Sequence, residues 1–411
     1  MSNKSRTMKE APKHTRTPKV RFPEYRDAEG WEETELQKIA LPVSERAING
    51  DGDKVLSLSG EHGIVLQSDY FGKMVAGDNA ERYIKIVYND FVYNDRTTMQ
   101  SVYGTIKRLA KYKDGIVSPI YKCFRFNREE NPVFWEWYFD SGVHESELGG
   151  LVNEGARAGR FNISIDKFLS TKVGHPNLPE QKKIAECLTS LDELIDAHRQ
   201  KLDALKAYKN GLMRQLFPCE GETFPRLRFP EFQDAPEWEV KNLASISNNL
   251  DNRRVPITES NREGGEIPYY GASGIVDYVN AYIFDEDLLC VSEDGANLVA
   301  RTYPIAFPIS GKTWVNNHAH VLKFEHGCTQ KLVEGYLNSI KLDNFLTGMA
   351  QPKLNKAMLD SIPIPLPDVP EQQRISDCLS FLDKLISAQS QKLEALKTHK
   401  KGLMQQLFPF R

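Results

Sequence analysis

Several features that would assign this chain to a common class are missing from its sequence. The six cysteines in 411 residues include no Cys-x-x-Cys pair, which favours reduced thiols in a cytoplasmic protein over a disulfide framework. No apolar run reaches membrane-spanning length and no signal-peptide core is present, so we expect a cytoplasmic location without membrane contact. The net charge of −3 excludes a global basic field, so nucleic-acid binding would need local basic patches.

Motifs for catalysis and cofactor binding are also lacking. The segment 310–313, Ser-Gly-Lys-Thr, resembles the end of a phosphate-binding loop, but Ala306 replaces the first glycine and Pro308 interrupts the backbone N–H groups. Segment 131–134, Asn-Pro-Val-Phe, lacks the second proline of the adenine-N6 methyltransferase signature. The pair His318 and His320 has no partner ligands at metal spacing. The sequence therefore predicts a binding protein without catalytic residues or a metal site.

The chain does contain a long internal repeat. Residues 178–218 and 369–409 agree at about 25 of roughly 40 positions without a gap. Each copy opens with Pro-Glu-Gln, which suits a helix start, and each closes with Phe-Pro, which a helix cannot continue. The repeat predicts two helices, each roughly 55 Å long at about 1.5 Å per residue.

Apolar residues recur every three or four positions in both copies, which predicts a heptad seam. Polar residues interrupt the seam at equivalent places, at His198 and Gln389 and again at Lys209 and Lys400. Matched interruptions indicate that the helices pack on each other in a fixed register; a core helix of an ordinary globular domain is the alternative. The seam residues are Ile184, Leu188, Leu191, Ile195, Leu202, Leu205, Leu212 and Leu216, with Ile375, Leu379, Leu382, Ile386, Leu393, Leu396, Leu403 and Leu407.

A shorter repeat precedes each variable region. The box Arg-Phe-Pro-Glu occurs at 21–24 and 228–231, followed by Trp31 and Trp238, and it predicts an extended lead-in anchored by its aromatic side chains. The inserts that follow show no continuous similarity, so one repeated frame presents two divergent inserts. The predicted organisation is a flexible basic tail (1–17), a first domain (18–178), a first helix (179–218), a second domain (219–368) and a second helix with the C-terminus (369–411).

Basic and hydrogen-bonding side chains concentrate in segments of both inserts. Side chains of these types make the phosphate and base-edge contacts of nucleic-acid complexes. A solvated charged face in the first insert and ordinary turns in the second are the alternative interpretations. The candidate contacts are Arg96, Lys107 and Arg108 in the first insert, and Tyr270, Ser273, Asn297, Lys312, Thr313, Asn316 and Lys353 in the second.

The short connection between the first helix and the second insert favours an antiparallel helix pair. About twenty residues join Leu216 to Trp238, and a parallel pair would stretch them over roughly 55 Å, close to the limit of an extended chain. We therefore expect a mixed α/β protein whose two globular domains are joined by two long antiparallel helices, a coiled-coil spacer with a pseudo-twofold, quasi-circular layout. Two different DNA-reading domains held at a fixed separation suit half-sites on a DNA duplex that are separated by a fixed gap.

With the repeated helices and the Arg-Phe-Pro-Glu boxes, the chain resembles the specificity subunit of type I restriction–modification enzymes. Segments 268–284, 288–298 and 351–356 are also similar to a target-recognition-domain pattern, whereas the first insert has no stretch like PYYGASG. The resemblance implies that each domain reads one half of a bipartite, asymmetric double-stranded DNA site. It also implies that the two helices act as a spacer and as a docking face for two modification subunits.

The resemblance assigns the chemistry to partner subunits. The modification subunits would bind S-adenosylmethionine and methylate adenine, and separate restriction subunits would use ATP and Mg for translocation and cleavage. No cofactor is expected in this chain. A coiled-coil adaptor without a DNA role and a stand-alone modifying enzyme are the competing classes; the missing cofactor loop argues against the second.

Overall fold

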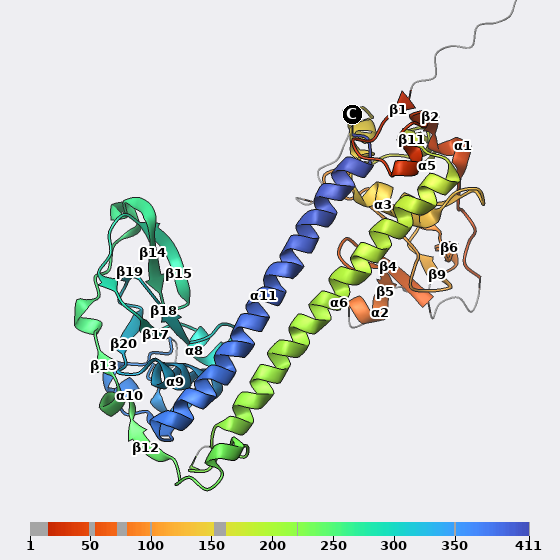
Figure 1. The fold of residues 1–411 in the computed structure, drawn as a ribbon. Helices are drawn as coiled ribbons and strands as arrows, with labels where there is room; N and C mark the ends of the chain where they lie inside the picture. The colour runs from red at the N-terminus through yellow and green to blue at the C-terminus, as the bar shows by residue number, and fades with distance from the viewer. Residues whose placement is uncertain are drawn as a thin grey trace, which may run out of the picture. The chain divides into compact units, whose positions relative to one another are not determined.

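The computed structural model describes residues 15–48, 54–71, 80–98, 101–151, 162–219, 221–348 and 351–410. The chain divides into two compact units: unit 1 comprises residues 1–197 and 393–411, and unit 2 comprises residues 198–392. Helices α6 (Leu178–Leu216) and α11 (Val369–Leu407), each of 39 residues, contribute to both units (Figure 1). Within the described ranges, no helix is long and apolar enough to cross a membrane.

Unit 1 is a mixed α/β domain whose described strands form sheets with the orders β1-β2-β11, β3-β10-β7-β8 and β5-β4-β9-β6. Its strands are β1 (Thr15–Arg16), β2 (Trp31–Glu35), β3 (Ala40–Pro42), β4 (Val55–Ser59), β5 (Gly63–Leu66), β6 (Ile84–Val87), β7 (Phe91–Asn94), β8 (Thr105–Arg108), β9 (Asp114–Val117), β10 (Lys122–Phe126) and β11 (Lys172–His175). Its shorter α-helices are α1 (Leu36–Ile39), α2 (Gln67–Phe71), α3 (Pro132–Asp140), α4 (Glu145–Gly149) and α5 (Ile165–Leu169).

Unit 2 is also a mixed α/β domain, and its described strands form sheets with the orders β12-β21, β13-β20-β17-β18 and β15-β14-β19-β16. Its strands are β12 (Glu239–Asn242), β13 (Asn248–Asn249), β14 (Gly264–Gly271), β15 (Gly274–Val279), β16 (Phe284–Asp285), β17 (Leu288–Ser292), β18 (Ala306–Ile309), β19 (Lys312–Val315), β20 (Ala319–Lys323) and β21 (Pro363–Leu366). Its shorter α-helices are α7 (Leu243–Ile246), α8 (Asn297–Ala300), α9 (Gly327–Ser339) and α10 (Lys356–Asp360).

The two inserts have the same strand order although they share no continuous sequence. Sheet β3-β10-β7-β8 of unit 1 corresponds strand by strand to β13-β20-β17-β18 of unit 2, and β5-β4-β9-β6 corresponds to β15-β14-β19-β16. A parallel pair occurs at the same place in both, between β4 and β9 and between β14 and β19. Backbone hydrogen bonds define this topology, so it persists while the side chains diverge. The inserts are therefore two versions of one fold.

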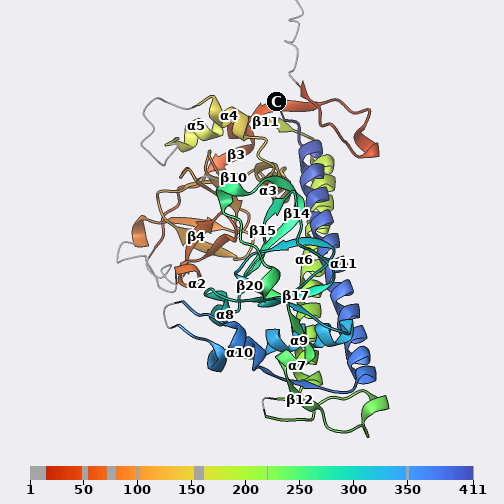
Figure 2. The ribbon, with the colours of Figure 1, turned by 90° about the vertical axis from the view of Figure 1, so that its left-hand side faces the viewer.

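Each unit has a hydrophobic core to which both long helices contribute. In unit 1, Leu188 of α6 and Leu407 of α11 belong to one core with the aromatic side chains of α3. In unit 2, Leu216 of α6 and Leu379 of α11 share a core with α9, which is drawn beside the lower part of the long helices in Figures 1 and 2. In unit 1 the start of α6 therefore packs near the end of α11. In unit 2 the end of α6 packs near the start of α11. Within each unit the helices run antiparallel.

The lysine interruptions of the seam form equivalent ion pairs. In unit 1, Lys400 of α11 pairs with Asp192 of α6. In unit 2 the repeat-related residues, Lys209 of α6 and Asp383 of α11, form the same pair. Each lysine reaches an acid of the opposite helix, so the polar interruptions keep a defined register between the helices.

The central interruption is also paired across the helices. Gln389 Nε2 donates to His198 Nδ1 at 2.7 Å and to the His198 carbonyl at 2.8 Å. None of the sixteen apolar seam residues is exposed; ten are buried and the others are half-buried. The predicted seam is therefore the buried face of both helices.

The two lead-in boxes bind the first turn of the long helices through their arginines. Arg21 donates from Nε and Nη2 to Glu180 at 2.8 and 2.7 Å. Arg228 makes the same bidentate contact with Glu371 at 2.8 and 2.6 Å. Both glutamates belong to the Pro-Glu-Gln helix starts. In each repeat the Arg-Phe-Pro-Glu box and the Pro-Glu-Gln start therefore contact each other.

The beginning of the described chain corrects one prediction. Residues 15 and 16 were expected to belong to a flexible tail but form β1, which pairs with β2. Arg16 is buried and forms ion pairs with Glu33 at 2.7 Å and Glu147 at 2.9 Å. These tertiary contacts, which local composition does not reveal, order the segment. The preceding residues, 1–14, lie outside the described residues.

Candidate nucleic-acid interface

Four loops of unit 2 are joined to one another at one edge of its sheets. We call residues 270–274, 292–297, 316–318 and 351–354 the unit 2 loop cluster. Its backbone hydrogen bonds run from Asn316 N to Tyr270 O (3.0 Å), Glu293 N to His318 O (2.9 Å), Gly295 N to Pro352 O (3.2 Å) and Leu354 N to Glu293 O (2.8 Å). The loops therefore form one connected surface instead of four independent turns.

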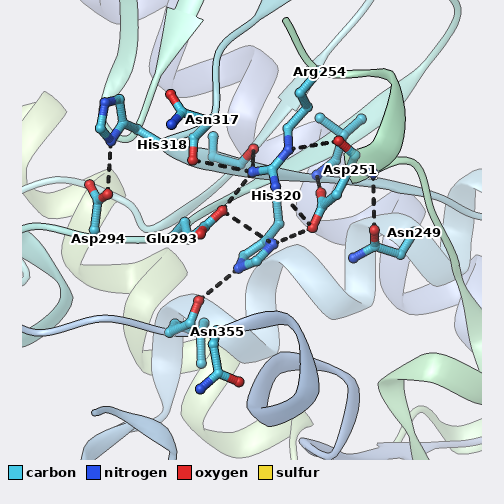
Figure 3. A network of polar contacts seen from close by, with 12 residues as sticks. Asn249, Asp251, Arg254, Glu293, Asp294, Asn317, His318, His320 and Asn355 are labelled. Atoms are coloured by element: carbon cyan, nitrogen blue, oxygen red, sulfur yellow. Dashed lines mark hydrogen bonds and ion pairs between the residues drawn. The ribbon is translucent and has the colours of Figure 1, made fainter. Parts of the chain in front are cut away.

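A buried polar network supports this surface (Figure 3). His320 of β20 is fully buried, with Nδ1 2.6 Å from Asp251 Oδ2 and Nε2 2.7 Å from the Leu354 carbonyl oxygen. Arg254 Nη1 donates to Glu293 Oε2 at 2.6 Å. The network ties the segment after β13 and strand β20 to two loops of the cluster.

The acids of this network favour the ionised state. Burial alone would raise the pKa of Asp251, but the hydrogen bond and charge of His320, the Val321 N–H and the Arg254 charge together lower that pKa. Burial alone would also raise the pKa of Glu293. Arg254 and His320 outweigh that effect, so the pKa of Glu293 is lowered. Two carboxylates are therefore held charged close to His320.

Several predicted contact residues of unit 2 are accessible. Ser273 and Lys312 are exposed, and the side chain of Lys353 is 52% exposed. Tyr270 is half-buried, and its ring stacks on Phe307 with 6.0 Å between ring centroids. Ser273, Lys312 and Lys353 are therefore accessible to a ligand in the folded domain, although Lys353 is paired with Glu293 at 3.2 Å.

Three other predicted contacts have roles within the domain itself. The structure corrects the prediction for Thr313 and Asn316, which are buried, whereas Asn297 is half-buried and stays a prediction. Thr313 is fully buried, because successive residues of β19 point to opposite faces of the sheet. Asn316 is buried, and its Oδ1 accepts the His318 N–H at 2.8 Å. The Asn297 amide binds both the N–H and the carbonyl of Tyr303 at 3.0 Å. The two asparagines hold loop backbone, and the threonine lies in the core.

Unit 1 carries a groove at the corresponding edge of its fold. We call it the unit 1 groove; its volume is about 1460 Å³, and the β4–β5 turn and the β7–β8 loop line it. These are the counterparts of the β14–β15 turn and β17–β18 loop, both in the unit 2 loop cluster. Arg96 and Lys107 line the groove, so the structure brings these two predicted contacts together.

The cations of unit 1 differ in their availability. Arg96 is exposed. Lys107 Nζ is 2.8 Å from Asp140 Oδ1, and its side chain is 19% exposed. Arg108 is 9% exposed and donates to Glu136 at 2.6 Å. Burial raises the pKa of Glu136 despite the nearby arginine. Arg108 therefore holds α3 against β8, and the structure does not support its prediction as a contact residue.

The buried network was missed by sequence reasoning. Asp251 had no assigned role, and His320 was considered only as a metal ligand. Asp251 and His320 are 69 residues apart, and His320 and Leu354 are 34 apart. No local spacing could reveal such contacts, although the density of polar residues in these turns had suggested candidate nucleic-acid contacts.

The chain thus contains two domains of one strand topology and two long helices that contribute to both units. The family model for the type I restriction modification DNA specificity domain matches residues 146–207 and 236–398, more than half of the chain. The chain belongs to this family. Specificity subunits of type I enzymes are non-catalytic DNA-recognition subunits, which agrees with the predicted binding protein.

Curated relatives support the same family. The chain is 36% identical over 154 residues to a Haemophilus influenzae protein named as a type I restriction enzyme specificity subunit, covering 38% of this chain and 40% of the relative. It is 26% identical over 272 residues to the type I restriction enzyme MjaVIII specificity subunit of Methanocaldococcus jannaschii, covering 58% and 62%. The chain thus matches less than two thirds of the length of each.

Solved structures confirm the mixed α/β fold. A crystal structure of a type I restriction–modification S subunit from M. genitalium aligns with a TM-score of 0.59 at 14% identity, covering 96% of this chain and 100% of the other. A chain from a study of complex assembly and conformational transition of the type I R-M system aligns with a TM-score of 0.55 at 17% identity, covering 92% and 97%. At these identities the likeness concerns the fold alone.

Proposed function

We propose that this chain is the DNA specificity subunit of a type I restriction–modification complex. It binds a bipartite, asymmetric double-stranded site, with one half-site for each recognition domain, and directs adenine-N6 methylation or restriction by partner subunits. The observation that carries this proposal is the shared topology of the two inserts, with loops at corresponding edges. One fold used twice, with different loop side chains, suits two different half-sites.

Contacts of two kinds are expected at these edges. Exposed cations such as Arg96 in unit 1 and Lys353 in unit 2 position each domain on phosphates, and polar loop residues such as Ser273 read base edges in the major groove. The mixed charge of the chain does not oppose this role, because phosphate contacts depend on local charge.

The helices α6 and α11 are proposed to act as the spacer between the two recognition domains, in a pseudo-twofold arrangement. Each is one continuous helix of 39 residues. Equivalent ion pairs, Lys400 with Asp192 and Lys209 with Asp383, support a fixed register. A rigid spacer would set the number of base pairs between the half-sites.

The outer faces of the same helices are proposed to bind two methyltransferase subunits. Leu194 and Leu385 occupy equivalent positions of the repeat, and they are 44% and 39% exposed. Large apolar side chains at matched exposed positions suit two copies of one partner. S-adenosylmethionine, and the ATP and Mg of the restriction subunits, would then be bound by the partners and not by this chain.

Replacement of residues 239–360 with the insert of another family member tests the proposal. Methylome sequencing of the host should show a new second half-site and an unchanged first half-site. An unchanged complete motif would contradict the assignment of one half-site to each domain. A coiled-coil adaptor without a DNA role would show no duplex binding in a gel shift with its methyltransferase partners present.

A further inference from the structure

The strand registers of the two inserts place Lys122 and His320 at equivalent positions. In unit 1, β10 pairs with β7 so that Lys122 is opposite Tyr93. In unit 2, the corresponding strands β20 and β17 place His320 opposite Val291. In both units the next residue of the strand accepts the same incoming backbone bond, Cys123 O from Val43 N and Val321 O from Leu250 N, each at 2.8 Å. Hydrogen bonding therefore establishes the equivalence without any sequence similarity.

Both positions are close to an acid at the end of the neighbouring strand, two residues beyond the paired residue. In unit 1, Lys122 Nζ forms an ion pair with Asp95, whose side chain is 2% exposed. In unit 2 the corresponding acid is Glu293, whose Oε2 is 3.8 Å from His320 Nδ1. Unit 1 thus has a lysine at this position, whereas unit 2 has a histidine, the residue type whose ordinary pKa lies near neutrality.

Both ring nitrogens of His320 face hydrogen-bond acceptors. Nδ1 is 2.6 Å from a carboxylate oxygen of Asp251, and Nε2 is 2.7 Å from the carbonyl oxygen of Leu354. An ionised carboxylate and a carbonyl can only accept, so both contacts are hydrogen bonds only when both nitrogens carry hydrogen. A neutral ring satisfies one contact and leaves two lone pairs opposed at the other.

We propose that His320, in its doubly protonated form, positions the Lys353 segment of the unit 2 loop cluster for DNA binding; this rests on the proposed function. Asp251 holds the Nδ1 proton, so deprotonation removes the Nε2 proton and sets its lone pair against the Leu354 carbonyl. The segment Pro352–Leu354 then loses its attachment to β20. Since Lys353 lies within that segment, the second half-site is bound less tightly as pH rises.

Some charged groups around His320 favour its protonated form and others oppose it. Asp251 at 2.6 Å and Glu293 at 3.8 Å favour the imidazolium. Arg254 and Lys353 oppose it, but each is itself paired with Glu293, at 2.6 and 3.2 Å. Two acids and two other cations are therefore the charged groups that surround the ring.

Duplex binding by the full chain with its methyltransferase partners tests the proposal. We would measure affinity between about pH 5.5 and 8.5 for a duplex with the complete site and for one with the second half-site scrambled. Wild-type affinity for the complete site should fall roughly tenfold as the pH rises across this range. We call this fall the pH step, and affinity for the scrambled duplex should not show it. His320→Lys, which copies the unit 1 arrangement, should bind tightly without the step. His320→Gln should bind weakly at every pH.

Two comparisons decide the outcome. His318→Gln removes the other imidazole of the loop cluster, and the pH step must survive this substitution. A step that persists in His320→Lys, or that disappears in His318→Gln, overturns the inference. A complex that binds selectively without any pH step also overturns it while leaving the proposed function intact. A complex that discriminates no sequence overturns both.

The protonation state can also be read without a substitution that risks misfolding. Nitrogen-15 spectra of the wild-type chain labelled at histidine should show hydrogen on both ring nitrogens of His320 at about pH 6. The loss of one of these hydrogens should coincide with the step in DNA affinity. A ring that stays neutral throughout the range of DNA binding overturns the proposal.

Discussion

Arg228 and Glu371 form a bidentate ion pair in which the arginine side chain is 9% exposed and the glutamate side chain 1% exposed. The guanidinium also donates to the carbonyl oxygens of Ala235 and Pro236. The pair joins the lead-in of the second repeat to the first turn of α11, and Arg21 with Glu180 repeats the contact in unit 1.

Arg228→Ala should destabilise unit 2 by about 3–5 kcal/mol, because it leaves the Glu371 carboxylate buried without its partner. Chemical denaturation gives the measurement. Lys241→Ala is the control: Lys241 pairs with Glu239 at the surface, and such pairs contribute about 0–1 kcal/mol. Equal losses in the two variants would show that the buried pair is not a structural requirement.

Lys353→Ala should weaken binding uniformly across DNA sequences and reduce the slope of log affinity against log salt by about one, because a phosphate contact is lost. Fluorescence anisotropy over a salt series provides both values. Lys341→Ala, an exposed lysine of unit 2 outside the loop cluster, should leave the slope unchanged. A selective loss for one base pair would instead identify Lys353 as a base reader.

Leu194→Glu and Leu385→Glu should each impair the binding of one methyltransferase subunit, because each places a charge in a proposed apolar contact. Native mass spectrometry of the purified complex should show one partner lost in each single variant and both lost in the double variant. Ser387→Glu, at another exposed position of α11, is the control. If the two single leucine variants and the double variant all keep both methyltransferase subunits, these positions are excluded as the docking face.

Insertion of four residues into both α6 and α11, in register, should lengthen the spacer by roughly 6 Å, close to two base pairs. Methylome sequencing should then show unchanged half-sites separated by a gap about two base pairs longer. Insertion into only one helix should disrupt the paired seam and abolish methylation. A constant gap in the double insertion would refute the spacer role.

His144 should make unit 1 less stable as the pH falls. Burial lowers the pKa of His144 to about 3, so the folded state stays neutral while the unfolded chain binds a proton below about pH 6.5. Stability should therefore decrease from about pH 6.5 toward pH 3, by at most about 1.4 kcal/mol per pH unit from this group. Denaturation over this range should show a shallower slope for His144→Leu. Identical slopes would contradict the assignment.

Local sequence patterns were sufficient for the repeated frame. The Pro-Glu-Gln starts and the heptad spacing predicted helices that the structure places at Leu178–Leu216 and Val369–Leu407. The shared interruptions at Lys209 and Lys400 indicated that the two helices pack on each other, and each lysine contacts an acid of the opposite helix. A periodic apolar stripe identifies the buried face of a helix, because helix geometry alone determines which residues lie on that face.

The accessibility of the predicted contact residues could be judged only in part from the sequence. Composition drew attention to the loops, and Arg96 and Lys353 are exposed, but their contacts with DNA stay a prediction. It could not distinguish them from Thr313, which lies in the core, or from Arg108, which is paired with Glu136. Side-chain type indicates what a residue can bind, whereas its partner in the fold decides whether it is available.

The sequence by itself determined the duplicated helical frame and the family to which the chain is similar, because both depend on residues close together along the chain. Only the tertiary structure decided that the two divergent inserts share one strand order and that Asp251, Glu293 and Leu354 surround His320. Those features depend on backbone hydrogen bonds and on side chains brought together from distant segments. Such contacts leave no periodic signal in the sequence.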